Sequence, residues 1–593
     1  MAACSGDNDG QAKEFLVLFV CHNSYFNMRF QELEALASGL LGVADPRREL
    51  YMEVPAPSTL SSSPLALVRL PGGEADARKL CERSVLIKAV LEVWSSGKSY
   101  EEAVEKARCK SARDQRRQFL APPLTVQIRV EAFGRTRSAE EKRGVLDEVS
   151  SLFEGDELID LRSPDTIIWA LEENEHLVDS RVARGSEPDR VFICRQVAGG
   201  RSVDKKLKNG EKAFFHRYDL SQRAVLGPTT LDNELSFIMA NCAWARPGCC
   251  GMDPFCGTGG LLVALSHFGV RLFGGEIDIR VVRGWQVAYV KNKEAVLQAA
   301  EARGLPTASK SAETKHHEAR ASGRVDAAEN AVELSPICAG PLSLEYLRGV
   351  LGLPLAGLPL GAEVKLASAA SADSSNNNTN NSKGQGSVKP ERDSELNYAG
   401  GCNIFTNFVQ YGKPMPDVVV CDNCMPPFRV VPGGWLDCIV TDPPYGVRAS
   451  AKKVGQEFKS WTIGRACEVP PQGEQVASPS KESAEEDELS QNLLGFASKA
   501  LRDDGRLVFL LPVDLADFLG IERAAATKGQ KKDLRLCIPE TTREPALLDE
   551  ARYADFIPTH ANLQLVDASL QVLSGGLGRL LVIMRRRPRD SRV

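Results

Sequence analysis

Apolar positions in the first 200 residues alternate between the spacing of strands and that of helices. Residues 15–20 and 65–70 are short apolar runs of the kind that form buried strands, and the second run ends at a Pro-Gly-Gly turn, residues 71–73. Within residues 83–94, apolar side chains recur at the spacing of one helical face. This spacing predicts a helix over residues 83–94.

Two further helices carry start signals. Ser99 precedes residues 100–107, and Ser138 opens residues 138–152 with Glu141 three positions later. A Ser side chain accepts from the free N–H groups of a first helical turn, and the Ser/Glu pair is a capping box. Both segments are therefore predicted to be helices with fixed starts.

The predicted elements group into three parts. An alternating segment at residues 125–130 adds a half-buried strand to the N-terminal part. Two long stretches, rich in Ala, Ser, Asn, Glu and Lys, lack core-forming patterns and read as surface inserts. The predicted parts are an α+β unit at residues 1–78, a second at 79–200, and an α/β domain at 201–593 with inserts at about 295–395 and 468–488.

Net charge and composition argue against a strongly basic, a secreted and a membrane-spanning protein. The net charge of −5 gives no overall basic footprint, so contact with nucleic acid must come from local patches. Residues 1–14 lack the pattern of a secretory leader, and no run of about 20 apolar residues is present. We expect a cytoplasmic protein without membrane contact, in which the 16 cysteines are reduced thiols. Cys421 and Cys424 form a CxxC without a second pair, so no metal site is predicted.

One local patch is basic and also rich in aromatic residues. Two readings stay open for it: contact with phosphates and bases, or a solvated linker between domains. The candidate RNA-contacting residues are Lys205, Lys206, Lys208, Arg217 and Arg223.

A glycine-rich loop stands between a strand and an apolar helix, at residues 252–260. Its glycines let the backbone approach a ligand, and the helix start offers free N–H groups. Asp253 would repel a pyrophosphate but suits the ammonium of a zwitterionic amino acid, whose carboxylate suits the helix start. The cofactor-binding candidates here are Asp253, Pro254, Cys256, Gly257 and Gly259.

Two more strand ends carry acidic residues. Glu276 follows the strand after the glycine loop, where an acidic side chain accepts hydrogen bonds from two ribose hydroxyls, and Asp278 is a nearby alternative. Asp422 and Asn423 end a later strand, where Asp422 suits an adenine amino group or serves only as a strand-end cap. In this order the features are typical of a nucleotide-binding βαβ unit.

The last motif is Asp442-Pro443-Pro444-Tyr445, after an apolar strand. Two prolines remove N–H donors and stiffen the chain, so the Asp442 carboxylate and the Pro443 carbonyl can both accept from one amino group. Tyr445 offers a face on which a base can stack. Together with the cofactor motifs, this turn predicts an S-adenosylmethionine-dependent methyltransferase that acts on the exocyclic amino group of a nucleobase.

Four segments carry a resemblance to a known family. Residues 223–241 (RAVLGPTTLDNELSFIMAN), 253–260 (DPFCGTGG) and 441–446 (TDPPYG) resemble the eukaryotic tRNA (guanine-10-N2) methyltransferases, and residues 83–100 (RSVLIKAVLEVWSSGKSY) resemble the N-terminal part of that family. The resemblance spans nearly the whole chain apart from the two inserts.

The resemblance implies an architecture, a substrate and a partner. It implies an N-terminal ferredoxin-like and THUMP RNA-binding region joined to a Rossmann-like class I methyltransferase domain with a seven-stranded mixed sheet. It also implies methylation of N2 of tRNA guanine 10, a heterodimer with a small zinc-binding activator protein, and a cofactor-binding role for Thr230. Where the family typically has Asp-Ile-Asp at the strand end, this chain has Glu276-Ile277-Asp278. Glu276 still offers two acceptor oxygens.

Two other classes of function fit parts of the pattern. The Pro-Pro-Tyr turn also suits methylation of DNA adenine or cytosine, or of a protein glutamine amide. A non-catalytic RNA-binding scaffold is the alternative outside enzymes. The N-terminal α+β units favour RNA over DNA or protein as the substrate.

Overall fold

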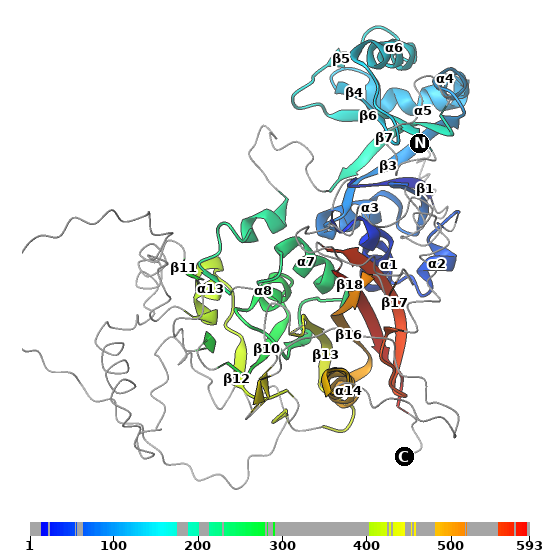
Figure 1. Cartoon of the computed structure of the whole chain (residues 1–593). Helices are drawn as coiled ribbons and strands as arrows, with labels where there is room; N and C mark the ends of the chain where they lie inside the picture. Colours follow the sequence, from blue (N-terminus) through cyan, green and yellow to red (C-terminus); the bar gives the residue numbers. More distant parts are fainter. Residues whose placement is uncertain are drawn as a thin grey trace, which may run out of the picture.

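The computed structural model describes two units joined by a broad contact (Figure 1). The described residues are, apart from short pieces, 13–21, 24–53, 63–174, 188–200, 213–227, 230–278, 403–423, 431–444, 481–515, 556–573 and 577–589. We call residues 13–200 the N-terminal unit and residues 213–589 the C-terminal unit. Most of the insert predicted at 295–395, including a possible helix at 342–353, lies outside the described residues.

The N-terminal unit is built on one seven-stranded sheet in the order β2-β1-β3-β7-β6-β4-β5. All neighbours pair antiparallel except β4 with β5 and with β6. The strands are β1 (Lys13–Phe19), β2 (Leu65–Leu70), β3 (Ile87–Gly97), β4 (Thr125–Ala132), β5 (Leu158–Ile159), β6 (Thr166–Glu173) and β7 (Arg190–Gly199).

Helices cover this sheet in two groups. One group lies beside the C-terminal unit and the other at the far end of the sheet (Figure 1). The near group is η1 (Phe26–Met28), α1 (Arg29–Leu41), α2 (Pro46–Glu49) and α3 (Gly73–Arg83); the far group is α4 (Tyr100–Ala107), α5 (Lys110–Leu120) and α6 (Ala139–Ser150). The boundary predicted at residues 78 and 79 falls inside α3, and the division of the sheet into two domains stays a prediction.

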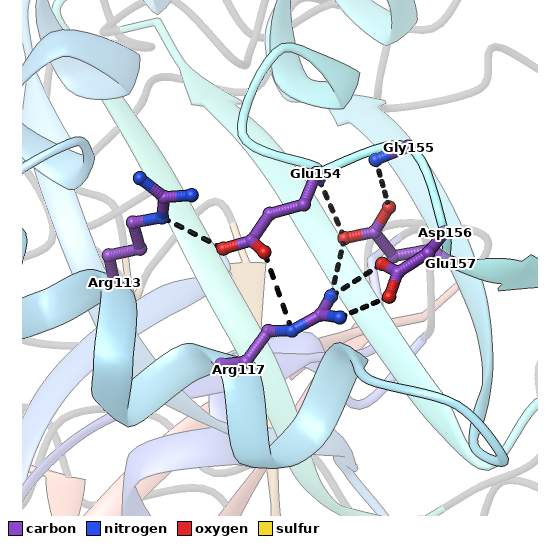
Figure 2. Close-up of polar contacts among 6 residues, drawn as sticks. All are labelled: Arg113, Arg117, Glu154, Gly155, Asp156 and Glu157. Carbon is purple, nitrogen blue, oxygen red and sulfur yellow. Dashed lines mark hydrogen bonds and ion pairs between the residues drawn. The ribbon is translucent and has the colours of Figure 1, made fainter.

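Ion pairs tie α5 to the segment before β5 (Figure 2). Nε of Arg113 lies 2.8 Å from Oε1 of Glu154, and Arg117 contacts Glu154, Asp156 and Glu157. Glu157 also accepts from the backbone N–H groups of Glu154 and Gly155. The acidic segment therefore neutralises two arginines of the basic helix α5.

The helix predicted over residues 83–94 is wrong. Arg83 ends α3, and Ile87–Gly97 form β3 instead. β3 lies between β1 and β7, and its first five residues are all buried. A strand with both faces covered presents a continuous apolar run, whose periodicity resembles that of a buried helix.

The two capped helices are confirmed. Ser99 Oγ accepts from the Glu102 N–H at the start of α4, and Ser138 and Glu141 form the complete capping box of α6. The strand predicted at residues 125–130 is β4. These local signals succeeded because each depends on residues within one helical turn or one strand.

The C-terminal unit is a seven-stranded mixed sheet in the order β12-β10-β9-β13-β16-β18-β17. Only β18 runs antiparallel to its neighbours, which confirms the seven-stranded mixed sheet of a class I methyltransferase that the resemblance implies. The strands are β9 (Cys250–Asp253), β10 (Arg271–Glu276), β12 (Asp417–Val420), β13 (Leu436–Thr441), β16 (Leu501–Asp514), β17 (Leu563–Val572) and β18 (Leu577–Arg586).

Helices cover both faces of this sheet. Alternate residues of β16 face opposite layers: Val508 packs with the layer of α7 and α8, and Leu507 with α14. The helices are η2 (Phe214–Tyr218), α7 (Asn233–Cys242), α8 (Gly260–His267), α13 (Ile404–Tyr411) and α14 (Lys481–Ala500). Short strand pairs, β8 (Val225–Leu226) with β11 (Tyr289–Val290) and β14 (Lys452–Lys453) with β15 (Gln456–Glu457), complete the described elements.

Candidate active site

Four neighbouring parallel strands end in acidic residues at one edge of the C-terminal sheet. Asp253 ends β9, Glu276 ends β10, Asp422 follows β12, and Asp442 follows β13. These strands are adjacent in the sheet, and parallel strands present their carboxyl ends at the same edge. Ligands of open α/β sheets bind at this edge, so the sheet brings together the four acidic residues that the sequence singled out.

Asp253 is the most deeply buried of the four. Its side chain is 2% exposed, and Oδ1 accepts from the Thr441 hydroxyl at 2.7 Å and from the Phe255 N–H at 3.0 Å. Burial raises the pKa of Asp253 from 3.8 to about 7; Asp442 and Glu276 add to the rise, and the Thr441 hydrogen bond opposes it. A carboxyl with this pKa exchanges its proton near neutral pH, and a cationic ligand favours the charged form.

The glycine loop bends sharply before α8. Gly257 has φ +49° and Gly259 has φ +81°, both in the left-handed region that favours glycine. A Cβ on Gly257 would meet open space, whereas one on Gly259 would lie 2.9 Å from Cγ1 of Ile404. The two glycines therefore face different sides of the loop, one open and one packed.

Glu276 connects this loop to the end of β10. Its Oε2 accepts from the Gly257 N–H at 2.9 Å, and its Oε1 accepts from the Asp278 N–H at 2.8 Å. Burial raises its pKa, and these two backbone donors lower it. Cys256, at the start of the loop, is 4% exposed and donates its N–H to the Gly275 carbonyl at 2.9 Å.

The segment after β12 closes the side of the loop. Asn423 donates its side-chain N–H to the Pro254 carbonyl, and Asp422 is 8% exposed beside it. The Cys421 N–H donates to the Glu276 carbonyl at 3.0 Å. The bond between Asn423 and Pro254 therefore holds the segment after β12 against the glycine loop.

The acceptor turn begins at the end of β13. Asp442 and Pro444 are half-buried and Pro443 is buried, while Tyr445 lies outside the described residues. Thr441, the last residue of β13, joins this turn to Asp253 through its hydroxyl. The sequence did not single out Thr441, although its place directly before Asp442 was the available signal.

Thr230 lies against the glycine loop. Its hydroxyl donates to the Gly227 carbonyl at 3.0 Å and lies 3.2 Å from the Thr258 hydroxyl. Asn407 of α13 supports the same place: its amide donates to the carbonyls of Val225 and Thr258, at 2.9 and 3.0 Å, and accepts from the Val225 N–H. No sequence pattern predicted Asn407, because its partners are more than 140 residues away.

The basic candidates divide into three cases. Lys205, Lys206 and Lys208 lie outside the described residues. Arg217 is exposed, with its guanidinium 5.5 Å from the centre of the Tyr218 ring. Arg223 is 1% exposed and donates to the Tyr218 carbonyl at 3.3 Å, so the reading of Arg223 as a surface contact for RNA is corrected to a packing role.

The described residues show no cluster of three or more His, Cys, Asp and Glu side chains that is placed to hold a metal ion. None of the described helices has both the length and the apolar character needed to cross a membrane.

The chain is similar to one family of domains and to several named proteins. Residues 13–202 match the family described as the Tmrp11 THUMP N-terminal domain. The tRNA (guanine(10)-N(2))-methyltransferase TRMT11 of Xenopus laevis is 25% identical over 579 residues, covering 97% of this chain and 84% of the relative. The human protein of the same name is 25% identical, with 89% and 81% covered, and that of Dictyostelium discoideum 24%, with 97% and 82% covered.

Solved structures give a looser likeness. The crystal structure of TrmN from Thermus thermophilus covers 97% of this chain and 99% of its own, with 14% identity and a TM-score of 0.32.

Proposed function

We propose that this chain is a THUMP-containing tRNA (guanine(10)-N2)-methyltransferase, which transfers a methyl group from S-adenosylmethionine to the exocyclic N2 of guanine 10 in tRNA. The observation that carries the proposal is the meeting of three acidic strand ends with the Asp442-Pro443-Pro444 turn at one sheet edge. Three of the acidic residues suit the cofactor, and the fourth suits an amino group.

The residues of the cofactor half fit the chemical groups of S-adenosylmethionine. Glu276 offers two acceptor oxygens to the ribose hydroxyls, and Asp422 offers one to the adenine amino group. Asp253 suits the ammonium, because a cation offsets the cost of ionising a buried carboxyl. The open side of Gly257 leaves room for a ligand at the loop. When bound, the cofactor supplies a methyl group already attached to a good leaving group.

The acceptor half positions the amino nitrogen. The Asp442 carboxylate and the Pro443 carbonyl accept the two amino hydrogens, which directs the nitrogen lone pair toward the methyl group. The bound cofactor would supply the methyl group, and the Asp442 carboxylate is placed to receive the proton that the amino group loses on methylation. Positioning contributes most of the rate, since orientation alone is worth about 7–11 kcal/mol.

The acceptor is proposed to be RNA because of the N-terminal unit. A THUMP domain and the family membership both support a tRNA substrate. Exposed Arg217 is one phosphate-contacting candidate among the described residues. A tRNA-modifying enzyme of this kind fits a place of action in the cytoplasm.

We further propose that the small zinc-binding activator covers the β12 edge of the C-terminal sheet. Among the described strands, β12 pairs with β10 alone and lies at the edge of the sheet, where a strand can pair with another chain. Val419 and Val420 on this strand are 38% and 44% exposed. An apolar edge strand beside Asp422 would be completed by a partner strand or loop.

The experiment offers three acceptors to the purified protein with its activator. Unmodified tRNA, double-stranded DNA and a glutamine-containing peptide are incubated with methyl-labelled S-adenosylmethionine. The proposal expects label in tRNA alone. Label in DNA or peptide but not in tRNA would overturn the substrate, and absence of cofactor binding by the complex would favour a non-catalytic scaffold.

A further inference from the structure

Helix α7 runs from the glycine loop to the N-terminal unit. Before its first turn, the hydroxyls of Thr230 and Thr258 lie 3.2 Å apart, and Asp232 caps the helix by accepting from the Glu234 N–H at 2.9 Å. At the other end, Asn241 is 1% exposed against the N-terminal unit. Helix α1 of that unit lies beside α7 (Figure 1). α7 therefore joins the candidate active site to the contact between units.

A fully buried carboxylate forms the centre of this contact. Glu32 of α1 is 0% exposed and accepts four hydrogen bonds. Three donors belong to its own unit: the Ser84 hydroxyl at 2.6 Å and the N–H groups of Val85 at 2.9 Å and Leu86 at 3.0 Å. The fourth donor is the side-chain amide of Asn241, at 2.7 Å. A buried carboxylate needs such donors, and Asn241 supplies the one that crosses between units.

Asn241 also bonds Arg83, which directly precedes the three residues that donate to Glu32. Its Oδ1 accepts from Nε of Arg83 at 2.9 Å, and its amide donates to the Arg83 carbonyl at 3.2 Å. The Arg83 guanidinium reaches further into the C-terminal unit, where it donates to the Ala245 carbonyl and stacks 3.6 Å from the centre of the Phe268 ring. One asparagine thus contacts both α1 and the end of α3.

Trp244 makes the second connection, from a strained backbone. Its φ is +56°, a left-handed conformation that a bulky residue adopts only where its neighbours hold it. Its Nε1 donates to the Ala35 carbonyl at 2.9 Å, and the Arg506 guanidinium lies 3.6 Å from the centre of its ring. A Cβ on Gly39 would lie 2.6 Å from the indole, so α1 approaches Trp244 closely only because Gly39 lacks one.

We call the contacts of Asn241 and Trp244 with the N-terminal unit the joint. Strand β3 connects the joint to the far end of the N-terminal unit. It begins at Ile87, directly after the residues that bond Glu32, and continues for 11 residues. At a rise of about 3.3 Å per residue it spans roughly 35 Å. A rotation of about 5° at the joint would therefore move the far end by roughly 3 Å over that length. The ion pairs of Figure 2 hold α5 to the β5 segment at that end.

We infer that Asn241 and Trp244 are positioning residues for methyl transfer: they fix the orientation of the N-terminal unit relative to the Asp442 turn, and thereby select which nucleotide of the bound RNA reaches the site. The inference rests on the proposed function, because it requires the N-terminal unit to hold the RNA. A displacement of 1 Å at a reacting group can cost about a hundredfold in rate, so a joint that rotates slightly is sufficient to lose the correct nucleotide.

The test compares two buried asparagines. Asn241→Ala removes the bond that crosses between units and leaves Glu32 with three donors. Asn174→Ala is the matched control: Asn174 is 4% exposed, and among the described residues its side chain bonds the Phe133 carbonyl and Glu172, both in the N-terminal unit. Both variants, in complex with the activator, are measured for cofactor affinity, tRNA affinity, kcat, and the position of the methyl group by mass spectrometry.

For Asn241→Ala we expect cofactor affinity within twofold and tRNA affinity within threefold of wild type. The expected kcat at the correct guanine falls at least tenfold, or methyl groups appear at other guanines; Asn174→Ala shows neither change. Trp244→Phe, which keeps the ring and loses the donor to Ala35, is expected to behave like a milder Asn241→Ala and guards against a folding defect.

Two results would overturn the inference. Wild-type kcat and methyl position in both joint variants would show that the joint does not position RNA. A parallel loss of cofactor affinity, kcat and thermal stability would show a structural role instead. Failure of the proposed function is separate, since in that case the wild-type complex itself leaves tRNA unmethylated.

Discussion

The hydroxyl of Thr441 donates a 2.7 Å hydrogen bond to Oδ1 of Asp253. This bond joins the last residue of β13 to the last residue of β9, two neighbouring strands whose ends serve different halves of the site. The residue directly before the acceptor turn thus stabilises the charged form of the carboxyl proposed to hold the cofactor ammonium. The Thr441 hydroxyl thus links the acceptor half of the site to the cofactor half.

Replacing Thr441 with Val keeps the shape of the side chain and removes that donor. The pKa of Asp253 then rises above about 7, because the bond that lowers it is lost while burial remains. We expect cofactor affinity at pH 7 to fall several-fold and to recover toward wild type at pH 9. Calorimetric titration across this pH range checks the prediction, and an equal loss at every pH would contradict it.

Asp253 also predicts a slope of stability with pH. Its pKa is about 7 in the folded protein, against 3.8 as the ordinary value, so between these values the folded state holds a proton that the unfolded chain has released. Stability contributed by this group is therefore lost as pH rises from about 4 to 7. The displacement corresponds to roughly 4 kcal/mol.

Asp253→Asn should remove this slope. We expect the wild type to lose stability relative to the variant as the pH rises from about 4 to about 7, measured by urea unfolding without cofactor. Parallel stability curves for the two proteins would refute the assignment.

The two loop glycines should respond in opposite ways to the same substitution. Gly259→Ala places a Cβ 2.9 Å from Ile404, so we expect a loss of unfolding free energy of about 2 kcal/mol or more, from backbone strain plus the clash. Gly257→Ala meets no protein atom within 4 Å and should cost less stability. Its methyl group would instead enter the open side of the loop, where cofactor affinity should fall at least tenfold. Equal stability losses with unchanged affinity for Gly257→Ala would rule out this orientation of the loop.

Asn407 should matter for stability more than its neighbour Gln410. Both amides bridge α13 to the segment at residues 222–225. Asn407 is 0% exposed and makes two of these bonds, both with Val225, whereas Gln410 makes one at the surface, to the Gln222 carbonyl, and one part-buried, from the Ala224 N–H at 2.8 Å. Asn407→Ala leaves buried backbone groups unpaired, at about 1–3 kcal/mol. Gln410→Ala should cost less, because water can replace exposed partners. Chemical unfolding of both variants measures the two losses of unfolding free energy. Equal losses would show that burial of the Asn407 bonds is not the cause.

The sequence was informative wherever a feature is local or follows strand order. The caps at Ser99 and Ser138 are confirmed because each depends on a backbone N–H within one turn. The acidic residues at the ends of β9, β10, β12 and β13 could be placed at one edge because parallel strands share a direction. The seven-stranded mixed sheet, by contrast, was an expectation from the family resemblance, and the structure confirms it.

The remainder depends on contacts between distant residues. β3 was read as a helix because burial on both faces removes the alternation that marks a strand. The bond between Glu32 and Asn241 joins residues 209 positions apart, and no single-sequence pattern reports such a pair. Arg223 belonged to a basic, aromatic segment by composition, yet its guanidinium is buried against the Tyr218 carbonyl. Composition cannot show which member of a charged cluster faces solvent.

The proposed function requires the Asp442 turn to accept the N2 amino group of tRNA guanine 10. Unmodified tRNA is incubated with the wild-type complex and with Asp442→Asn, which retains the size of the side chain and loses its capacity to take a proton. Single-turnover transfer and mass-spectrometric mapping of the product measure the rate and the position. We expect N2-methylguanosine at position 10 with wild type, and a loss of at least a hundredfold in rate with the variant while tRNA and cofactor affinities stay within threefold. A methyl group on another nucleotide or atom, or an unchanged rate in Asp442→Asn, would contradict it.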